Sequence, residues 1–210
     1  MTFSATPYDH LSELIFVGDP MCSWCYGFNP ELQKLRETLK EIPFSMIMGG
    51  LRDGEIFDAQ KLKNHLGYWE AVHRTTGLPF DATALSQEGF NYTTEPACRA
   101  VVTAKQLDII QAYALYSALQ QAFYAEGRDI TQTEVILEIA KTVGFDSAVF
   151  QRLFTSDAAY KATLAEKLKA KTYGVSSFPT LIIIDKQGHM SQIRGYKSYE
   201  ALIPFLKKQP

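Results

Sequence analysis

The stretch Asp19-Pro20-Met21-Cys22-Ser23-Trp24-Cys25-Tyr26 decides the fold, because it places two cysteines at C-x-x-C spacing between an apolar run and a helical pattern. The run before it, Leu14 to Val17, predicts a short buried strand, and apolar residues from Phe28 to Leu39 recur at helical spacing after it. We therefore expect Cys22 at the start of a helix, where unpaired N–H groups and the helix dipole favour a thiolate. Two thiols one turn apart can close and reopen a disulfide without a metal or an organic cofactor.

Composition bounds the class of protein. The 210 residues are 46% hydrophobic, which is enough for a large core in one domain or in one domain with an insertion. The net charge is −2 and no Lys or Arg cluster stands out, so we expect neither a nucleic acid nor a membrane partner. The first basic residue is Lys34, so a secretory signal is not expected. Three cysteines do not resemble a secreted disulfide scaffold. These features favour the cytoplasm.

The first fifty residues predict a βαβ unit. A strand at Glu13 to Val17 is followed by a helix from Cys22 or Ser23 to about Lys40, and a second strand, Ile42 to Met48, ends at two glycines. We expect the two strands to be parallel with a right-handed crossover. Pro30 lies inside the helix pattern, where its missing N–H predicts a kink.

Helix signals dominate from Asp53 to Thr172, and no strand pattern is convincing there, which predicts an all-helical block. An aromatic stripe in this block, Tyr113, Tyr116, Phe123 and Tyr124, is typical of a core-facing helix. The expected helices are Asp58 to Thr75, Glu95 to Leu107, Ile110 to Glu126, one that follows a Thr131 and Glu134 capping box and stops at Gly144, Asp146 to Phe154, and Asp157 to about Tyr173.

Strand signals return after the block. Thr180 to Ile184 and His189 to Arg194 flank a turn, which predicts a β-hairpin. A last helix is expected from Ser198 to about Lys208, with Leu202, Phe205 and Leu206 facing inward. The element order is therefore βαβ, helical block, ββα.

This order carries a resemblance to a known family. With C-x-x-C at the first helix and Ser176-Ser177-Phe178-Pro179-Thr180 opening the second half, the chain resembles the DsbA-like family of the thioredoxin superfamily. It is most similar to cytoplasmic members with a C-x-W-C motif; the specific match covers Asp19 to Phe28 and Gly174 to Thr180. The resemblance implies an α/β thioredoxin fold with a large all-helical insertion. Residues 11–52 plus 174–210 would form the thioredoxin-fold domain, and residues 53–173 the inserted helical domain.

The resemblance also implies an activity, that of a thiol–disulfide oxidoreductase or isomerase acting on protein or small thiol and disulfide substrates. By position Cys22 is the attacking thiolate, Cys25 resolves the mixed disulfide, and Pro179 is the cis-proline that faces the pair. No cofactor is implied, and glutathione is a candidate redox partner. The residue before a cis-proline can offer backbone groups to an extended substrate. The expected substrate contacts are Met21, Trp24, Tyr26, Ser177 and Phe178.

Two positions depart from the secreted oxidants of the family. Their dipeptide between the cysteines contains a histidine, whereas Ser23-Trp24 supplies no cation. The buried acid that many thioredoxin-fold proteins carry six residues before the first cysteine is replaced by Phe16. Asp19 is the nearest acid, and a negative charge beside a thiolate disfavours it. We therefore expect weaker thiolate stabilisation than in the secreted oxidants.

Other residues have structural interpretations. A zinc site needs four ligands, but Cys98 is the only further cysteine and the four histidines are scattered, so they are assigned to surface or packing positions. Cys98 lies on an apolar-faced helix and is expected to be buried as a small hydrophobe. The segment Asn91 to Thr94 precedes that helix, and we expect it to face the active site.

Two other functions remain open. One is a glutathione-dependent transferase or isomerase of the kappa or hydroxychromene-carboxylate isomerase type, in which a single Ser or Cys activates glutathione; the presence of Cys25 argues against it. The other is a non-catalytic thioredoxin-fold binding module or chaperone. The sequence fixes neither the net direction of electron flow nor the physiological substrate.

Overall fold

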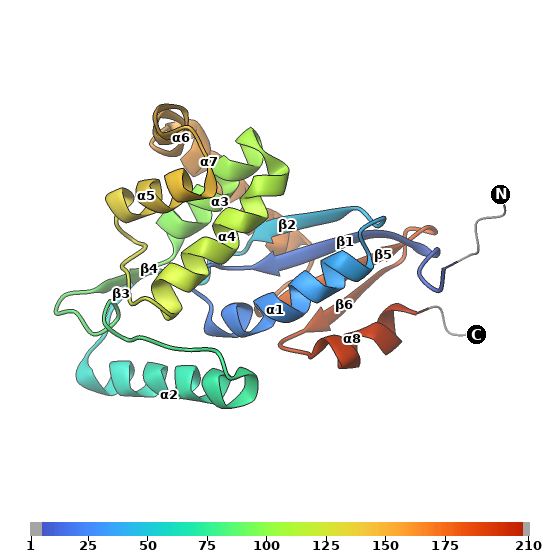
Figure 1. Cartoon of the computed structure of the whole chain (residues 1–210), viewed down its shortest axis with the longest axis horizontal. Helices are drawn as coiled ribbons and strands as arrows, with labels where there is room; N and C mark the ends of the chain where they lie inside the picture. The colour runs from blue at the N-terminus through green and yellow to red at the C-terminus, as the bar shows by residue number, and fades with distance from the viewer. Residues whose placement is uncertain (1–5, 208–210) are drawn as a thin grey trace.

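The computed structural model describes residues 6–207, so residues 1–5 and the expected helix end at Lys208 lie outside the described residues. Its centre is a four-stranded sheet in the order β2-β1-β5-β6 (Figure 1). β1 and β2 are parallel, as the βαβ pattern predicts, and β5 runs antiparallel to both β1 and β6. The strands are β1 Leu11–Gly18, β2 Phe44–Met48, β5 Thr180–Asp185 and β6 Met190–Arg194.

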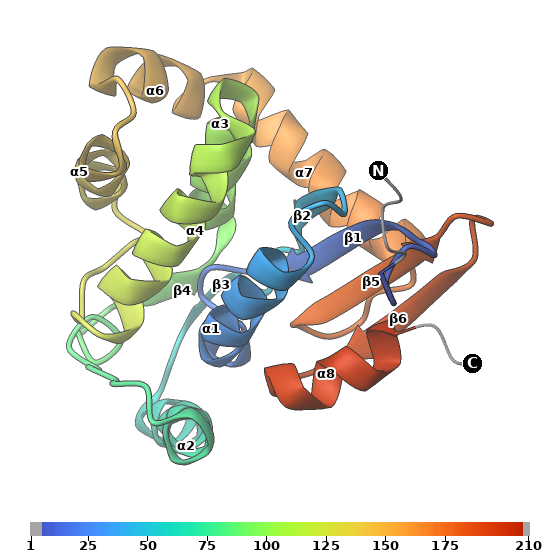
Figure 2. The ribbon, with the colours of Figure 1, turned by 45° about the vertical axis from the view of Figure 1, so that its right-hand side comes forward.

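Both faces of the sheet are covered, because alternate side chains of a strand point to opposite faces. Leu14 and Phe16 of β1 belong to the large core beneath α1 (Ser23–Thr38) and α8 (Tyr199–Leu206). Ile15 and Val17 pack on the other face against Ala170 of α7 (Asp157–Thr172). Figure 2 shows α1 and α8 on one side of the sheet and α7 on the other.

The segment between β2 and α7 is not wholly helical, and this expectation was wrong. It contains a two-stranded antiparallel ribbon of β3 (Asp53–Ile56) and β4 (Asn91–Thr93). Strands of three and four residues are too short to show an alternating pattern. The helices of this segment are α2 Ala59–Thr76, α3 Glu95–Leu107, α4 Ile109–Tyr124, α5 Thr133–Val143 and α6 Ser147–Phe154.

Most helix boundaries agree with the sequence pattern, and two details do not. The predicted capping box at Thr131 is absent, because the Thr131 hydroxyl donates to Asp129 (2.6 Å). The N-cap of α5 is Gln132, whose side chain makes no cap hydrogen bond. Phe205 is 65% exposed rather than inward. The aromatic stripe of α4 is buried as expected, and α1 runs through Pro30.

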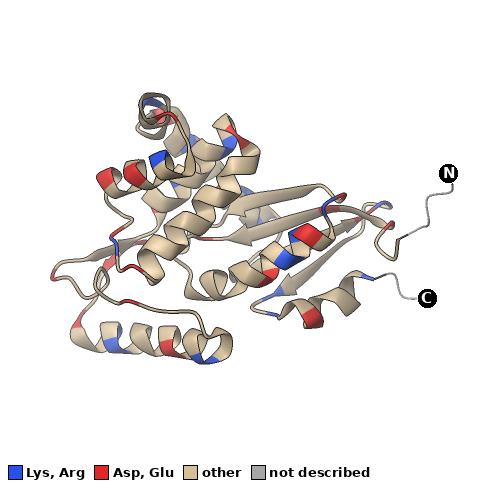
Figure 3. Ribbon diagram, in the orientation of Figure 1, with Lys and Arg blue, Asp and Glu red and all other residues tan. Residues whose placement is uncertain are grey.

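One hydrophobic cluster contains residues of both predicted parts of the chain. The division into residues 11–52 plus 174–210 and residues 53–173 stays a prediction. Acidic and basic positions are interspersed over the helices and strands (Figure 3). No helix within residues 6–207 combines the length and apolarity needed to cross a membrane.

Candidate functional site

Cys22 lies where β1 gives way to α1, as the sequence predicts. It is the N-cap of α1, with extended backbone (φ −95°, ψ 114°), and its sulfur accepts a hydrogen bond from the Cys25 N–H (3.3 Å). The Cys22 thiol also lies 3.7 Å from the Phe178 carbonyl oxygen. The residue is 6% exposed. An N-cap sulfur that receives a backbone N–H is in a position that stabilises negative charge on it.

Cys25 lies one turn further into α1 and is completely buried. Burial is the main reason that the pKa of the Cys25 thiol is raised well above its ordinary value, and the neighbouring Cys22 adds to the shift. All three cysteines are free thiols in this structure. The two cysteines of the motif therefore differ: Cys22 keeps a small exposed fraction and its sulfur accepts an N–H, whereas Cys25 is completely buried.

The Phe178–Pro179 peptide bond is cis, as expected from the resemblance. The loop is held by the Gly195 N–H, which donates to the Pro179 carbonyl (2.8 Å), and by the Thr180 hydroxyl, which donates to the Ser177 carbonyl (2.8 Å). The Phe178 ring lies directly on Gly49, where an added Cβ would come 2.0 Å from the ring. A side chain at position 49 would therefore displace the Phe178 ring from this position.

The predicted apolar rim is smaller than the sequence suggested. Met21 is 0% and Tyr26 is 4% exposed, so both side chains are buried in this structure, and the expectation that they contact a substrate stays a prediction. Tyr26 instead stacks on Tyr124, with ring centroids 4.9 Å apart. Trp24 and Phe178 are half-buried and Ser177 is exposed, and their contact with substrate stays a prediction.

A buried carboxylate lies behind the cysteine loop. Asp19 is 0% exposed and accepts hydrogen bonds from the Met21 N–H (2.8 Å), the Leu51 N–H (2.7 Å) and the Cys98 thiol (3.3 Å). Burial raises the pKa of Asp19, while these donors oppose the shift. The sequence identified Asp19 only as the nearest acid. No local pattern reports its contacts with Leu51 and Cys98, which are distant in the chain.

Cys98 is fully buried, as expected, and burial followed by the charge of Asp19 raises the pKa of its thiol well above the ordinary value. The segment from Asn91 to Thr94 contacts the active-site loop from its buried side, since the Tyr92 hydroxyl donates to the Met21 carbonyl. Across residues 6–207, His, Cys, Asp and Glu side chains form no group of three or more that could hold a metal ion.

The model of the DSBA-like thioredoxin domain matches residues 13–207. The chain belongs to this family. A solved structure of a candidate protein disulfide isomerase from Nitrosomonas europaea is 33% identical, covers 92% of this chain and 95% of its own, and superposes with a TM-score of 0.84. The cytosolic disulfide reductase DsbM from Pseudomonas aeruginosa is 23% identical over 86% of this chain and 88% of its own, with a TM-score of 0.74, and shares the DSBA-like fold.

Curated relatives of this DSBA-like chain carry a different name. The ClpXP adapter protein SpxH of Bacillus licheniformis is 24% identical over 193 residues, which are 90% of this chain and 63% of the relative. SpxH of Halalkalibacterium halodurans is 22% identical over 201 residues, or 64% of its length. The chain thus spans just under two thirds of the length of these relatives.

Proposed function

We propose that the protein is a thiol–disulfide oxidoreductase that works through the Cys22–Cys25 pair in a reducing compartment such as the cytoplasm. The observation that carries the proposal is the difference between the two sulfurs: Cys22 is at the helix N-terminus and accepts an N–H, and Cys25 is buried within the same turn. Membership of the DSBA-like family and the 33% identical relative named as a disulfide isomerase support it.

The chemistry follows from these positions. The Cys22 thiolate attacks one sulfur of a substrate disulfide, forms a mixed disulfide and releases the other substrate sulfur as a thiolate. That thiolate can take the Cys25 proton, after which the Cys25 thiolate attacks Cys22 and releases the second substrate sulfur. In sum, one substrate disulfide becomes two thiols and the dithiol becomes a disulfide. The reverse sequence oxidises a substrate dithiol.

The Phe178 backbone also positions the substrate in this proposal. Its carbonyl oxygen lies 3.7 Å from the Cys22 sulfur. A substrate segment that extends alongside the loop would therefore bring its own sulfur close to the Cys22 sulfur. Glutathione is a candidate redox partner of the same pair, which is consistent with the solved complex of DsbM with GSH.

Replacing Cys25 by Ser tests the proposal. The attack by Cys22 should survive while resolution is lost, so the variant should accumulate a mixed disulfide and turnover of a model disulfide should fall by at least about a hundred-fold. Mass spectrometry of the trapped adduct and a turnover assay measure the two effects. Full activity in the Cys25→Ser variant would instead favour a glutathione-dependent transferase or isomerase. A wild-type protein without any exchange in a glutathione buffer would contradict both and favour a binding role, such as that named for the SpxH relatives.

A further inference from the structure

Helix α7 carries an apolar stripe that nothing in the described chain covers. Tyr160, Leu164 and Leu168 follow one another at four-residue spacing, which places them on one face of the helix. They are 46%, 41% and 60% exposed, respectively. Large apolar side chains grouped on one exposed face are typical of an interaction surface, whereas single exposed ones are ordinary.

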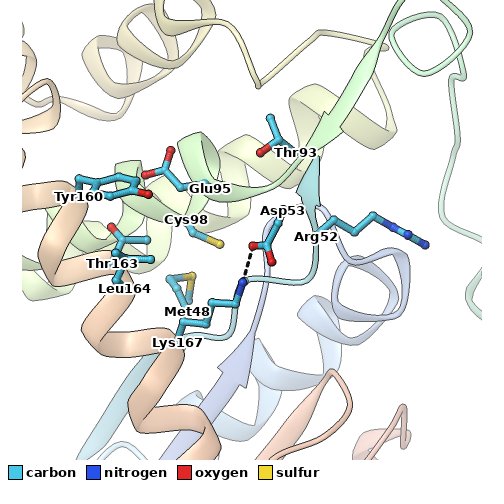
Figure 4. Close-up of a pocket in the computed structure, with 11 residues that line it drawn as sticks. Met48, Arg52, Asp53, Thr93, Glu95, Cys98, Tyr160, Thr163, Leu164 and Lys167 are labelled. Carbon is cyan, nitrogen blue, oxygen red and sulfur yellow. Dashed lines mark hydrogen bonds and ion pairs between the residues drawn. The ribbon is translucent and has the colours of Figure 1, made fainter. Parts of the chain in front are cut away.

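The stripe borders a cavity of about 360 Å³ (Figure 4). Tyr160 and Leu164 of α7 form one wall, and Met48 and Cys98 lie across from them. The charged residues that line it are each paired: Lys167 with Asp53, Arg52 with Glu55, and Glu95 with Arg99. The cavity is therefore suited to an apolar side chain and offers no free charge for a small anion.

The cavity adjoins the cysteine site. Gly50 lines it, and the Phe178 ring packs on the preceding residue, Gly49. The backbone carbonyl of Phe178 faces Cys22. At the other end, α7 finishes at Thr172 and the chain turns at Gly174, in the left-handed region (φ 70°), into the cis-proline loop. The cavity is thus adjacent to the loop before Pro179, and the C-terminal end of α7 leads into the same loop.

The charge around the stripe is positive. Lys161, Lys169 and Lys171 are exposed, and no ion pair among residues 6–207 engages them. Asp157 is the one exposed acid of the helix, because Glu166 is bonded to Lys105 and to the Met48 N–H. A second copy of this chain is a poor occupant, since each face carries three exposed lysines against one exposed acid and two faces of the same net charge repel each other. An acidic partner is favoured.

We propose that the α7 surface, defined by Tyr160, Leu164, Leu168 and the adjoining cavity, docks an extended acidic segment of a disulfide-containing protein substrate. One apolar side chain of the segment fills the cavity, flanking carboxylates face the lysines, and the chain continues past Phe178 to Cys22. The stripe spans roughly 12 Å at 1.5 Å per residue, which four extended substrate residues would cover. This inference rests on the proposed function and adds a substrate class to it.

Three disulfide-linked peptides test the proposal in a single turnover with prereduced protein. They carry the same fluorescent thiol in disulfide linkage and differ in one tract: glutamates flanking a leucine and a phenylalanine, lysines flanking the same pair, or glycine and serine. The acidic apolar peptide should be reduced about ten-fold faster than the other two, with a small disulfide as reference. Equal rates for the three peptides would overturn the proposal.

Surface variants locate the effect. The double variant Leu164→Glu and Leu168→Glu should abolish the preference, while Ile110→Glu, at a residue that is 79% exposed on α4, should keep it. The double variant Lys161→Glu and Lys169→Glu should shift the preference to the basic peptide. A preference that survives all of these changes places docking elsewhere. A loss of self-association in the leucine variant, measured by sedimentation, would make a second copy the occupant and also overturn the proposal.

Binding is measured separately from chemistry. In the double variant Cys22→Ser and Cys25→Ser, fluorescence anisotropy of the labelled acidic peptide reports docking alone. Binding without any reduction by the wild type would refute the proposed function and keep the docking surface. Reduction of the small disulfide without selective peptide binding would refute the docking surface and keep the proposed function.

Discussion

Met21, the residue before Cys22, is held at both of its backbone groups. Its N–H donates to the buried Asp19 carboxylate (2.8 Å), and its carbonyl accepts from the Tyr92 hydroxyl. Both partners are fully buried, so water cannot replace either bond. Met21 immediately precedes Cys22, the N-cap of α1. These two hydrogen bonds therefore hold the backbone that positions the Cys22 sulfur.

Removal of one of these bonds should be measurable. Tyr92→Phe deletes only the hydroxyl and leaves the Met21 carbonyl without that donor, so we expect the free energy of unfolding to fall by about 1 to 3 kcal/mol. Urea denaturation followed by circular dichroism measures it. Tyr68→Phe is the matched control, because Tyr68 is 60% exposed and its change should be within about 0.5 kcal/mol. Equal effects of the two variants would mean that the Met21 contact contributes nothing.

At the scale of elements, β2 is an edge strand whose outer backbone groups are capped by side chains. The Met46 carbonyl accepts from Lys105 of α3, and the Met48 N–H donates to Glu166 of α7 (2.8 Å). Lys105 and Glu166 also pair with each other, and both side chains are 17% exposed. Unpaired groups on an edge strand invite pairing with another chain, so this ion pair both protects the edge and joins α3 and α7 to the sheet.

The Lys105–Glu166 pair should therefore be worth more than a surface ion pair. We expect Glu166→Gln to lower the free energy of unfolding by about 2 kcal/mol, because it leaves a largely buried ammonium without its counterion. Glu138→Gln, which breaks the more exposed pair with Arg128, should cost at most about 1 kcal/mol. Chemical denaturation of both variants gives the comparison. A double-mutant cycle of Glu166→Gln and Lys105→Met that showed no coupling energy would contradict the stabilising role of this ion pair at the β2 edge.

The elements of the sheet could be predicted from the sequence, and the contacts between distant segments could not. The run from Leu14 to Val17 and the cysteines after it predicted β1, the start of α1 and the βαβ unit, because their signals lie within a few residues. The ribbon of β3 and β4 was missed, since its short strands are stable only through pairing across the 34 residues between Ile56 and Asn91.

The candidate site shows the same limit. Cys22, Cys25 and Pro179 could be named from local motifs and the resemblance. The burial of Met21 and Tyr26 could not, because it depends on aromatic side chains of α4 and β4 that close over them. The Asp19 contacts with Leu51 and Cys98 likewise join three separate segments, and only the folded chain brings them together.

At the scale of the whole molecule, the segment between β2 and α7 is tied to the cysteine site by an aromatic cluster around His65 of α2. The His65 ring lies 5.0 Å from Tyr92, 5.2 Å from Phe57 and 6.1 Å from Trp69, measured between ring centroids. His65 is 8% exposed, and its Nε2 has no hydrogen-bond partner in the structure. Burial, aided by the nearby Arg52 charge, lowers the pKa of His65 to about 4.

This cluster should make the stability of the protein depend on pH. The pKa of His65 is lower in the folded chain than its ordinary value of 6.5, which applies when the chain is unfolded. The neutral ring therefore favours folding above pH 6.5, and stability is lost as pH falls from 6.5 towards 4. Between about pH 7 and pH 5 we expect a loss of about 2 kcal/mol from this residue, measured by urea denaturation at each pH. His65→Phe keeps an aromatic ring without a titrating group and should remove this slope; His65→Gln serves if the first variant does not fold. A slope equal in the wild type and in the His65 variant would show that the ring does not titrate on unfolding.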